Sequence, residues 1–152
     1  MTITKATQED LRAILDLQHL AYQSEAKLCN NPRIPPLVQT LDEVKQEFER
    51  GIFLKAVDDN GDIIASVRAY SENDTLYIGK LIVHPDFQGR GIGTALLKEI
   101  EILYPHSRYE LFTSSKSLRN IALYERLGYA SFKEQIVSDN LKFIYLEKLA
   151  SV

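Results

Sequence analysis

The sequence predicts a mixed α/β domain whose central sheet is mostly antiparallel. Two segments rich in β-formers, Ile52–Val57 and Ile63–Tyr70, flank an Asn-Gly turn and predict a hairpin. A buried strand at Leu76–Val83 is followed by a helical pattern that ends at Pro105 and by another strand at Tyr109–Thr113. Such a strand–helix–strand unit implies a parallel pair. These patterns predict a sheet of about six to seven strands flanked by about four helices.

The N-terminal part of the chain contains two helices that their caps predict. Thr7 with Asp10, and Thr40 with Glu43, have the spacing of capping boxes, and apolar residues at helical spacing follow each pair. Between the two helices, Ser24–Gln39 lacks this periodicity and contains three prolines. We therefore expect a long loop there, with a function of its own.

The remaining elements lie at the two ends of the chain. Ile3–Lys5 reads as a short first strand. Near the other end, we expect Ser117 to cap a helix that Gly128 closes as its left-handed residue. A final hairpin pairs Tyr129–Val137 with Leu141–Glu147.

Length and composition limit the class of protein. The 152 residues correspond to one domain, 1–152, and 45% hydrophobic with 26% charged residues is ordinary for a globular protein. A net charge of −3 disfavours nucleic acid as a partner, and no apolar segment approaches the ~18 residues of a membrane span. Cys29 is the single cysteine, so we expect a reducing, cytoplasmic location. The three histidines lack metal-ligand spacing, and no metal is expected.

Alternating glycines stand where the strand Leu76–Val83 passes into the following helix. Within Gly89–Gly93, backbone N–H groups can point at one ligand at the positive end of a helix dipole, and Arg90 adds a charge. This composition predicts a phosphate site. The dinucleotide pattern GxGxxG fails, because Thr94 or Leu96 occupies its last glycine position, and no Gly-Lys pair is present for a Walker A loop.

Two motifs resemble those of the GCN5-related N-acetyltransferase (GNAT) family. Gln88–Gly93, with the sequence QGRGIG, fits Q/R-x-x-G-x-G/A, the family's loop for the pyrophosphate of acetyl-coenzyme A. Asn120–Tyr129 is similar to the family segment in which an asparagine contacts the cofactor and a tyrosine lies near its sulfur. The predicted order of strands and helices also resembles the acetyltransferase fold over nearly the whole chain.

This resemblance implies an N-acetyltransferase that moves an acetyl group from acetyl-CoA to the primary amine of a small molecule or protein. The amine would attack directly in a ternary complex. One main-chain amide of the strand before the loop would stabilise the oxyanion, and Gly79 is expected to form a bulge at which this strand leaves its neighbour. The implied cofactor-binding residues are Leu81, Ile82, Val83, Gln88, Gly89, Arg90, Gly91, Ile92, Gly93, Thr94, Asn120 and Tyr124.

Tyr124 is the expected general acid. Its reference pKa of about 10 lies a little above the ~8.5 of a thiol, so proton transfer to the leaving thiolate would be nearly balanced. Many family members carry a glutamate base on the strand before the loop, but this chain has Gly79 and Lys80 there. The base comes from elsewhere, or water relays the proton, or the amine arrives uncharged. The candidate bases are Glu25, Glu72 and His84.

The resemblance places the acceptor amine over Ser24–Gln39, where a proline-containing loop hints at a small acceptor. The implied substrate-binding residues are Tyr22, Glu25, Arg33 and Tyr70. The resemblance is also compatible with a homodimer. One alternative remains open: a non-catalytic acyl-CoA-binding sensor or interaction module, which the missing strand glutamate favours. A nucleotide-binding domain is disfavoured by the failed dinucleotide and Walker patterns.

Overall fold

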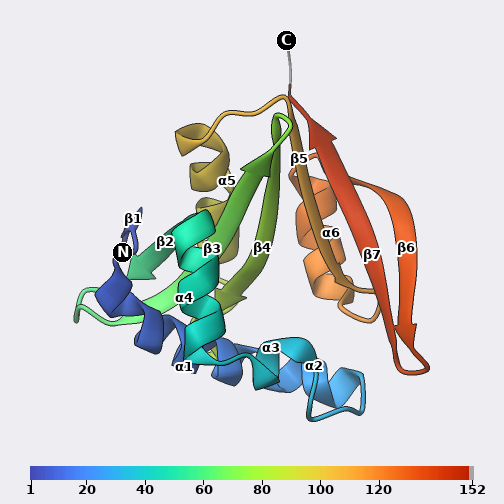
Figure 1. Ribbon diagram of the computed structural model, residues 1–152, viewed down its shortest axis with the longest axis horizontal. Coiled ribbons are helices and arrows are strands. Elements are labelled where there is room, and N and C mark those ends of the chain that lie inside the picture. The colour runs from blue at the N-terminus through green and yellow to red at the C-terminus, as the bar shows by residue number, and fades with distance from the viewer. Residues whose placement is uncertain (151–152) are drawn as a thin grey trace.

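A seven-stranded mixed sheet forms the centre of the molecule, in a computed structural model that describes residues 1–150 (Figure 1). Its order is β1-β2-β3-β4-β5-β7-β6, and all neighbouring strands are antiparallel except β4 and β5. The mixed, mostly antiparallel sheet with one parallel unit is therefore confirmed. The strands are β1 (Thr2–Lys5), β2 (Ile52–Val57), β3 (Ile63–Glu72), β4 (Thr75–Val83), β5 (Arg108–Ser114), β6 (Ala130–Ser138) and β7 (Leu141–Leu149).

Helices cover both faces of the sheet. Apolar residues of α1 and α4 form one core with Phe53 on one face, whereas α5 forms the larger core on the opposite face (Figure 1). No helix within residues 1–150 combines the length and apolarity needed to cross a membrane. The helices are α1 (Leu11–Ala21), α2 (Gln23–Leu28), α3 (Pro35–Val38), α4 (Leu41–Arg50), α5 (Ile92–Leu103) and α6 (Leu118–Arg126), with 3-10 turns at Gln8–Asp10 and Pro85–Phe87.

The predicted loop at Ser24–Gln39 was wrong in part, because the short helices α2 and α3 lie within it. They contain six and four residues, too few for a 3.6-residue repeat to be visible in the sequence. The adjacent prolines that suggested a loop occupy the first turn of α3, where a missing N–H costs nothing. Ala26 of α2 and the nearby Ile34 form a small buried cluster with Leu141 of β7, which fixes this segment against the last hairpin.

Two of the predicted helix ends are confirmed. Thr40 and Glu43 form a complete capping box at the start of α4. At the end of α6, Gly128 has φ +97°, and the amide of Tyr129 donates to the carbonyl of Tyr124, as in a Schellman motif. Ser117 is the N-cap residue of α6, but the predicted side-chain cap is absent: its hydroxyl donates to the Glu25 carboxylate and accepts no hydrogen bond from the first amides of the helix.

Strands β4 and β5 separate soon after they begin. They pair at only three positions, ending at Tyr77 opposite Glu110, and Figure 1 shows them diverging from there. Against β3, strand β4 contains one extra residue, since Arg68 pairs with Gly79 but Ser66 pairs with Ile82. The bulge therefore follows the predicted position by one residue: it contains Lys80, whose φ of +48° lies in the left-handed region.

Candidate active site

The glycine loop folds as an anion site at the start of α5. Gly89 and Gly91 have φ of +77° and +80°, and Gly91 is the N-cap residue of the helix. Glycine adopts this left-handed region at no steric cost. The first amides of α5, like those of any α-helix, have no helical partners. These amides and the positive end of the helix dipole favour a phosphate group.

A cavity of about 640 Å³ lies beside this loop. Lys116, Arg119 and Arg126 contribute positive charge to its wall, and Arg119 donates to the side-chain oxygen of Gln88 at 3.0 Å. A β-carbon at Gly93 would contact Leu81, Val83 and Leu123, so a larger residue would narrow the cavity. The predicted cofactor residues that line it are Leu81, Ile82, Val83, Gln88, Gly89, Gly91, Ile92, Gly93, Thr94 and Asn120.

Two predicted cofactor residues lie elsewhere. Arg90 does not line this cavity; its guanidinium donates to the carbonyl of Asp86 at 3.3 Å and lies 5.0 Å from the centre of the Phe87 ring. Tyr124 lines a second cavity instead. The amides, cations and size of the first cavity nevertheless fit a pyrophosphate-containing group such as acetyl-CoA.

The second cavity, of about 840 Å³, opens on the face of the sheet that α4 partly covers. Among residues 1–150, four line both cavities: Tyr22, Glu25, Leu81 and Asn120. We call these four residues the junction. A group bound in one cavity can be reached from the other only where the two meet, so the junction is where a transfer reaction would take place.

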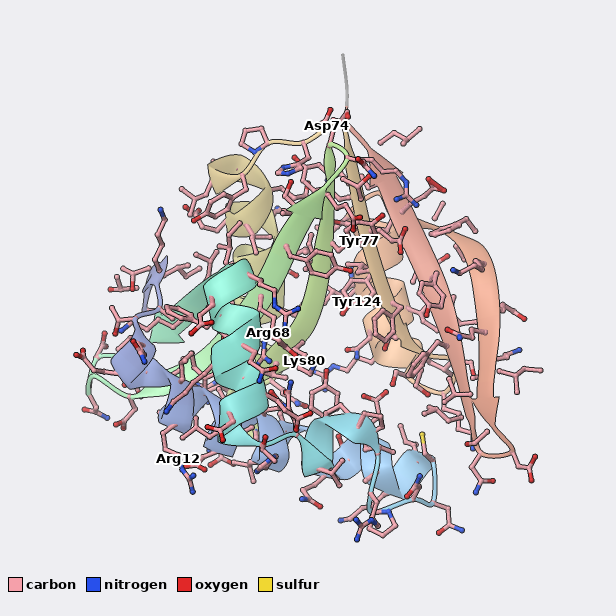
Figure 2. The ribbon with its side chains drawn as sticks, in the orientation of Figure 1. Arg12, Arg68, Asp74, Tyr77, Lys80 and Tyr124 are labelled. Carbon is pink, nitrogen blue, oxygen red and sulfur yellow. The ribbon has the colours of Figure 1, made fainter. Side chains whose placement is uncertain are left out.

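Tyr124 and Glu25 lie close together near the junction. The Tyr124 side chain is buried and points into the second cavity from α6 (Figure 2). Burial, and then the negative charge of Glu25, raise the pKa of Tyr124 above its usual value, and the same causes raise the pKa of Tyr22. The reference pKa of a tyrosine lies close to that of a thiol, but in the resting site the pKa of Tyr124 lies further above the thiol value.

Of the three candidate bases, only Glu25 lines either cavity. Its carboxylate accepts a hydrogen bond from Ser117, which holds α2 against the start of α6. Glu72 is exposed near the far end of β3. The His84 ring accepts from the amide of Asp86 at 3.0 Å and stabilises the turn after β4. The structure thus separates candidates that the sequence could not rank.

Some of the predicted acceptor residues line a cavity and one does not. Tyr22, Glu25 and Tyr70 line the second cavity, whereas Arg33 is exposed and lines neither cavity. The α2–α3 connection holds Arg33 away, and its amide donates to the side chain of Asn31 at 2.9 Å.

Comparison with known proteins identifies the family. The model of a protein family described as "Acetyltransferase (GNAT) family" matches residues 11–129 of this chain. The chain belongs to the GNAT acetyltransferase family. Among curated proteins, it is 29% identical over 119 residues to the UPF0157 protein YqkA of Bacillus subtilis. This match covers 78% of the chain but only 34% of that protein.

Solved structures share the fold of this family. The ribosomal-protein-S18-alanine N-acetyltransferase of Escherichia coli superposes with a TM-score of 0.82 at 19% identity, covering 99% of this chain and 94% of that one. A phosphinothricin acetyltransferase from Sinorhizobium meliloti, solved in complex with AcCoA, has a TM-score of 0.78 at 17% identity, covering 97% and 87%. At these identities the likeness concerns the fold.

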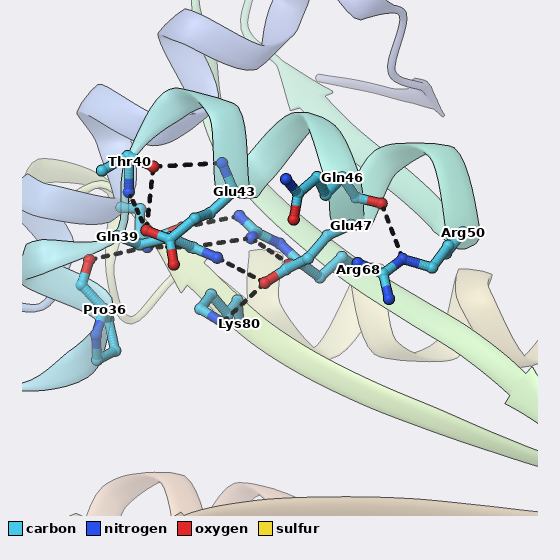
Figure 3. Close-up of polar contacts among 10 residues, drawn as sticks. Pro36, Gln39, Thr40, Glu43, Gln46, Glu47, Arg50, Arg68 and Lys80 are labelled. Atoms are coloured by element: carbon cyan, nitrogen blue, oxygen red, sulfur yellow. Dashed lines mark hydrogen bonds and ion pairs between the residues drawn. The ribbon is translucent and has the colours of Figure 1, made fainter.

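Sequence reasoning missed a polar network that forms one wall of the second cavity (Figure 3). The buried Arg68 guanidinium donates to Glu47 and to the side-chain oxygen of Gln18, both at 2.8 Å. Gln39 donates to the same Glu47 carboxylate at 2.5 Å, and the Lys80 ammonium lies 3.7 Å from it. One feature of the sequence could have predicted this network: Arg68 is a single charged residue within the apolar segment around residues 63–70. A buried charge at such a position needs a partner.

Replacing Glu47 with alanine should lower the free energy of unfolding by about 3 kcal/mol, because it leaves the Arg68 guanidinium buried with only amide partners. Urea denaturation of the native protein and the variant measures this loss in the free energy of unfolding. Glu49→Ala, in the same helix but exposed, should cost less than about 0.5 kcal/mol. Equal losses in the two variants would contradict a structural role for the network.

The same carboxylate makes stability depend on pH. Burial would raise the pKa of Glu47, but Lys80 and Arg68 outweigh burial and hold it below its usual value. A lowered pKa stabilises the fold above the unfolded-state value of about 4.3, and this stabilisation is lost as the pH falls through the folded-state value. The difference in stability between the native protein and Glu47→Gln should therefore shrink below about pH 4.

Proposed function

We propose that this protein is an N-acetyltransferase that transfers the acetyl group of acetyl-CoA directly to a primary amine in a ternary complex. The observation that carries the proposal is the junction, where a phosphate-binding cavity meets a separate cavity for an acceptor. The acceptor is the amine of a small molecule or a protein. Family membership supports the reaction type, and the glycine loop supports the choice of cofactor.

The first cavity holds acetyl-CoA, which supplies the acetyl group as a thioester. The amides of the glycine loop would bind the pyrophosphate, and the main chain of Leu81–Val83 would pair with the pantetheine amides, because β5 has left this edge of β4 free. An amide of Ile82 or Val83 would donate to the carbonyl oxygen as negative charge develops there.

Glu25 would act as the general base. An alkylamine is mostly protonated at pH 7 and must lose a proton before or during attack. The Glu25 carboxylate stands at the junction. It can accept the ammonium proton and release it to solvent before attack, and then accept the second proton that the nitrogen loses as the C–N bond forms and the C–S bond breaks. This residue would replace the strand glutamate that the chain lacks.

Base and acid are then coupled. The negative charge of Glu25 is one cause of the raised pKa of Tyr124. Once Glu25 accepts the amine proton, that charge is neutralised and Tyr124 becomes a stronger acid at the moment when the sulfur leaves. Tyr124 would then protonate the thiolate, and return of the proton from Glu25 to Tyr124 restores the starting state. Burial would keep Tyr124 protonated until this step.

The first test is thermal unfolding with and without acetyl-CoA. At about 100 times its dissociation constant, a ligand specific for the native state adds ~2.7 kcal/mol, which should raise Tm by about 5 °C or more. NAD and ATP are the controls and should not match this shift. The absence of a shift, or a larger one with ATP or NAD, would overturn the cofactor assignment.

A non-catalytic acyl-CoA-binding module is the alternative, and product formation with any amine excludes it. The feature that favoured this alternative was the missing strand glutamate, and the position of Glu25 supplies a carboxylate in its place. The cytoplasmic location and a homodimer stay predictions. For the latter, β6 is the strand to examine, since all nine of its residues are exposed.

A further inference from the structure

Two groups of aromatic side chains face the acceptor cavity from the strands on either side of the β4–β5 divergence. On one side, Tyr70 and Tyr77 stack with ring centres 5.0 Å apart. On the other side, the Phe112 ring lies 4.8 Å from that of Phe143 and 5.2 Å from that of Tyr145. We call these groups the tyrosine wall and the phenylalanine wall.

Both walls remain open to solvent. Tyr70 is 50% exposed and Phe112 is 47% exposed, although each lies in the middle of a sheet whose other face is well packed. Figure 2 shows Tyr77 directed into the region between β4 and β5, toward the same space as Tyr124. Exposed aromatic side chains gathered around one cavity are typical of a ligand site.

Gly79 lines the acceptor cavity beside the tyrosine wall. Within residues 1–150, no heavy atom other than those of Gly79 itself and its two chain neighbours lies within 4 Å of the position that its β-carbon would take. Its φ is outside the left-handed region, so the backbone does not require glycine here. The missing side chain therefore enlarges the cavity without serving the turn or the bulge. A larger residue would occupy ligand space and leave the backbone unstrained.

The charges around the cavity balance one another. Its lining contains three carboxylates and three cationic side chains: Glu25, Glu47, Glu110, Arg50, Arg68 and Lys80. Glu47 is paired with Arg68, and Glu110 is paired with Arg108 from outside the lining. Such a cavity favours neither a polyamine nor a strongly anionic acceptor.

We propose that the acceptor is a primary amine that carries a planar apolar group, which lies over Gly79 between the tyrosine wall and the phenylalanine wall. The inference rests on the acetyltransferase function proposed above, because it assigns the amine to the junction. Aromatic rings pack well against flat apolar groups, and a ring of the acceptor would cover the two exposed walls at once. Gly79 leaves the room that such a ring needs.

Three amines test the preference: 2-phenylethylamine, 2-cyclohexylethylamine and ethylamine, each followed by release of the coenzyme A thiol. The kcat/KM for 2-phenylethylamine should exceed that for ethylamine by about 10-fold or more, because the ring is removed from water. The saturated ring has a similar size but is not planar, and it should give an intermediate value. Equal values for all three amines would overturn the inference.

Gly79→Leu provides the structural test. The added side chain should lower the ratio of kcat/KM for 2-phenylethylamine to that for ethylamine by about 10-fold, because it fills the space between the walls. Ser131→Leu adds the same group on the exposed strand β6, outside both cavities, and should keep the native ratio. The thermal shift with acetyl-CoA shows that each variant is folded and binds the cofactor.

The outcomes separate the two proposals. Turnover of ethylamine with no preference for the ring, or a native ratio in Gly79→Leu, overturns the aromatic acceptor and leaves the acetyltransferase standing. Failure of the native protein to acetylate any of the three amines, despite a thermal shift with acetyl-CoA, overturns this inference. Within the proposed function it leaves a protein amine as the acceptor.

Discussion

Replacing Glu25 with glutamine should lower kcat/KM for ethylamine by about 10³-fold at pH 7, while the thermal shift with acetyl-CoA persists. The substitution keeps the size of the side chain and removes the ability to accept the amine proton. The loss should fall to about 10-fold for trifluoroethylamine, which is already mostly uncharged at neutral pH and depends less on a base. Steady-state kinetics with the two amines measures both effects.

Ser117→Ala is the matched control for Glu25. It removes the hydrogen bond to the carboxylate and keeps the carboxylate itself. If the bond only positions Glu25, this variant should lose less than about 10-fold in kcat/KM. Equal losses of Glu25→Gln with ethylamine and trifluoroethylamine would show that Glu25 supports the structure of the site and does not accept the proton.

Replacing Tyr124 with phenylalanine should lower kcat by about 10²-fold with little change in the KM for acetyl-CoA. The phenol points into the acceptor cavity, and the ring is buried, so the variant keeps the packing and loses only the proton donor. Tyr129→Phe is the control: this neighbouring tyrosine is also buried, but its hydroxyl donates to Glu101 at 2.9 Å and lines neither cavity. Its kcat should remain within about threefold of the native value.

Coupling between the two residues predicts a non-additive double variant. In Glu25→Gln the charge that raises the pKa of Tyr124 is absent and the base step limits the rate, so adding Tyr124→Phe should cost less than it does alone. A native kcat in Tyr124→Phe would remove this residue from the mechanism, and strictly additive losses would contradict the coupling.

Local patterns predicted most of the fold. The Thr40–Glu43 capping box, the glycine after α6 and the hairpin around residues 58–62 are each decided by residues adjacent in the chain, and each is present as predicted. The glycine loop is similar: a strand end, three alternating glycines and a helix start together place backbone amides at one point. Short helices were missed because α2 and α3 contain less than two turns.

The candidate site was likewise predictable only where residues adjacent in the chain form it. One part of the first cavity is the segment Leu81–Thr94 around the glycine loop, and the sequence motif predicted this part of the lining. The rest of the lining comes from residues 21–28 and 116–126, which only the folded chain brings to the loop. Within residues 1–150, the second cavity combines residues from five strands and from several helices, including α2 and α4. No spacing in the sequence relates Tyr70 to Phe112 or Glu47 to Arg68. The Ser117–Glu25 contact joins positions 92 residues apart, so the sequence could predict Ser117 at the start of α6 but not the partner of its hydroxyl.

The sequence by itself determined the family, the order of the strands and the turn conformation of the glycine loop, because each depends on backbone conformations that nearby residues impose. The tertiary structure alone decided which carboxylate reaches the junction, how burial and charge shift the pKa of Tyr124, and which aromatic residues line the second cavity. These properties depend on desolvation and on distances between side chains that only strand pairing and helix packing bring together.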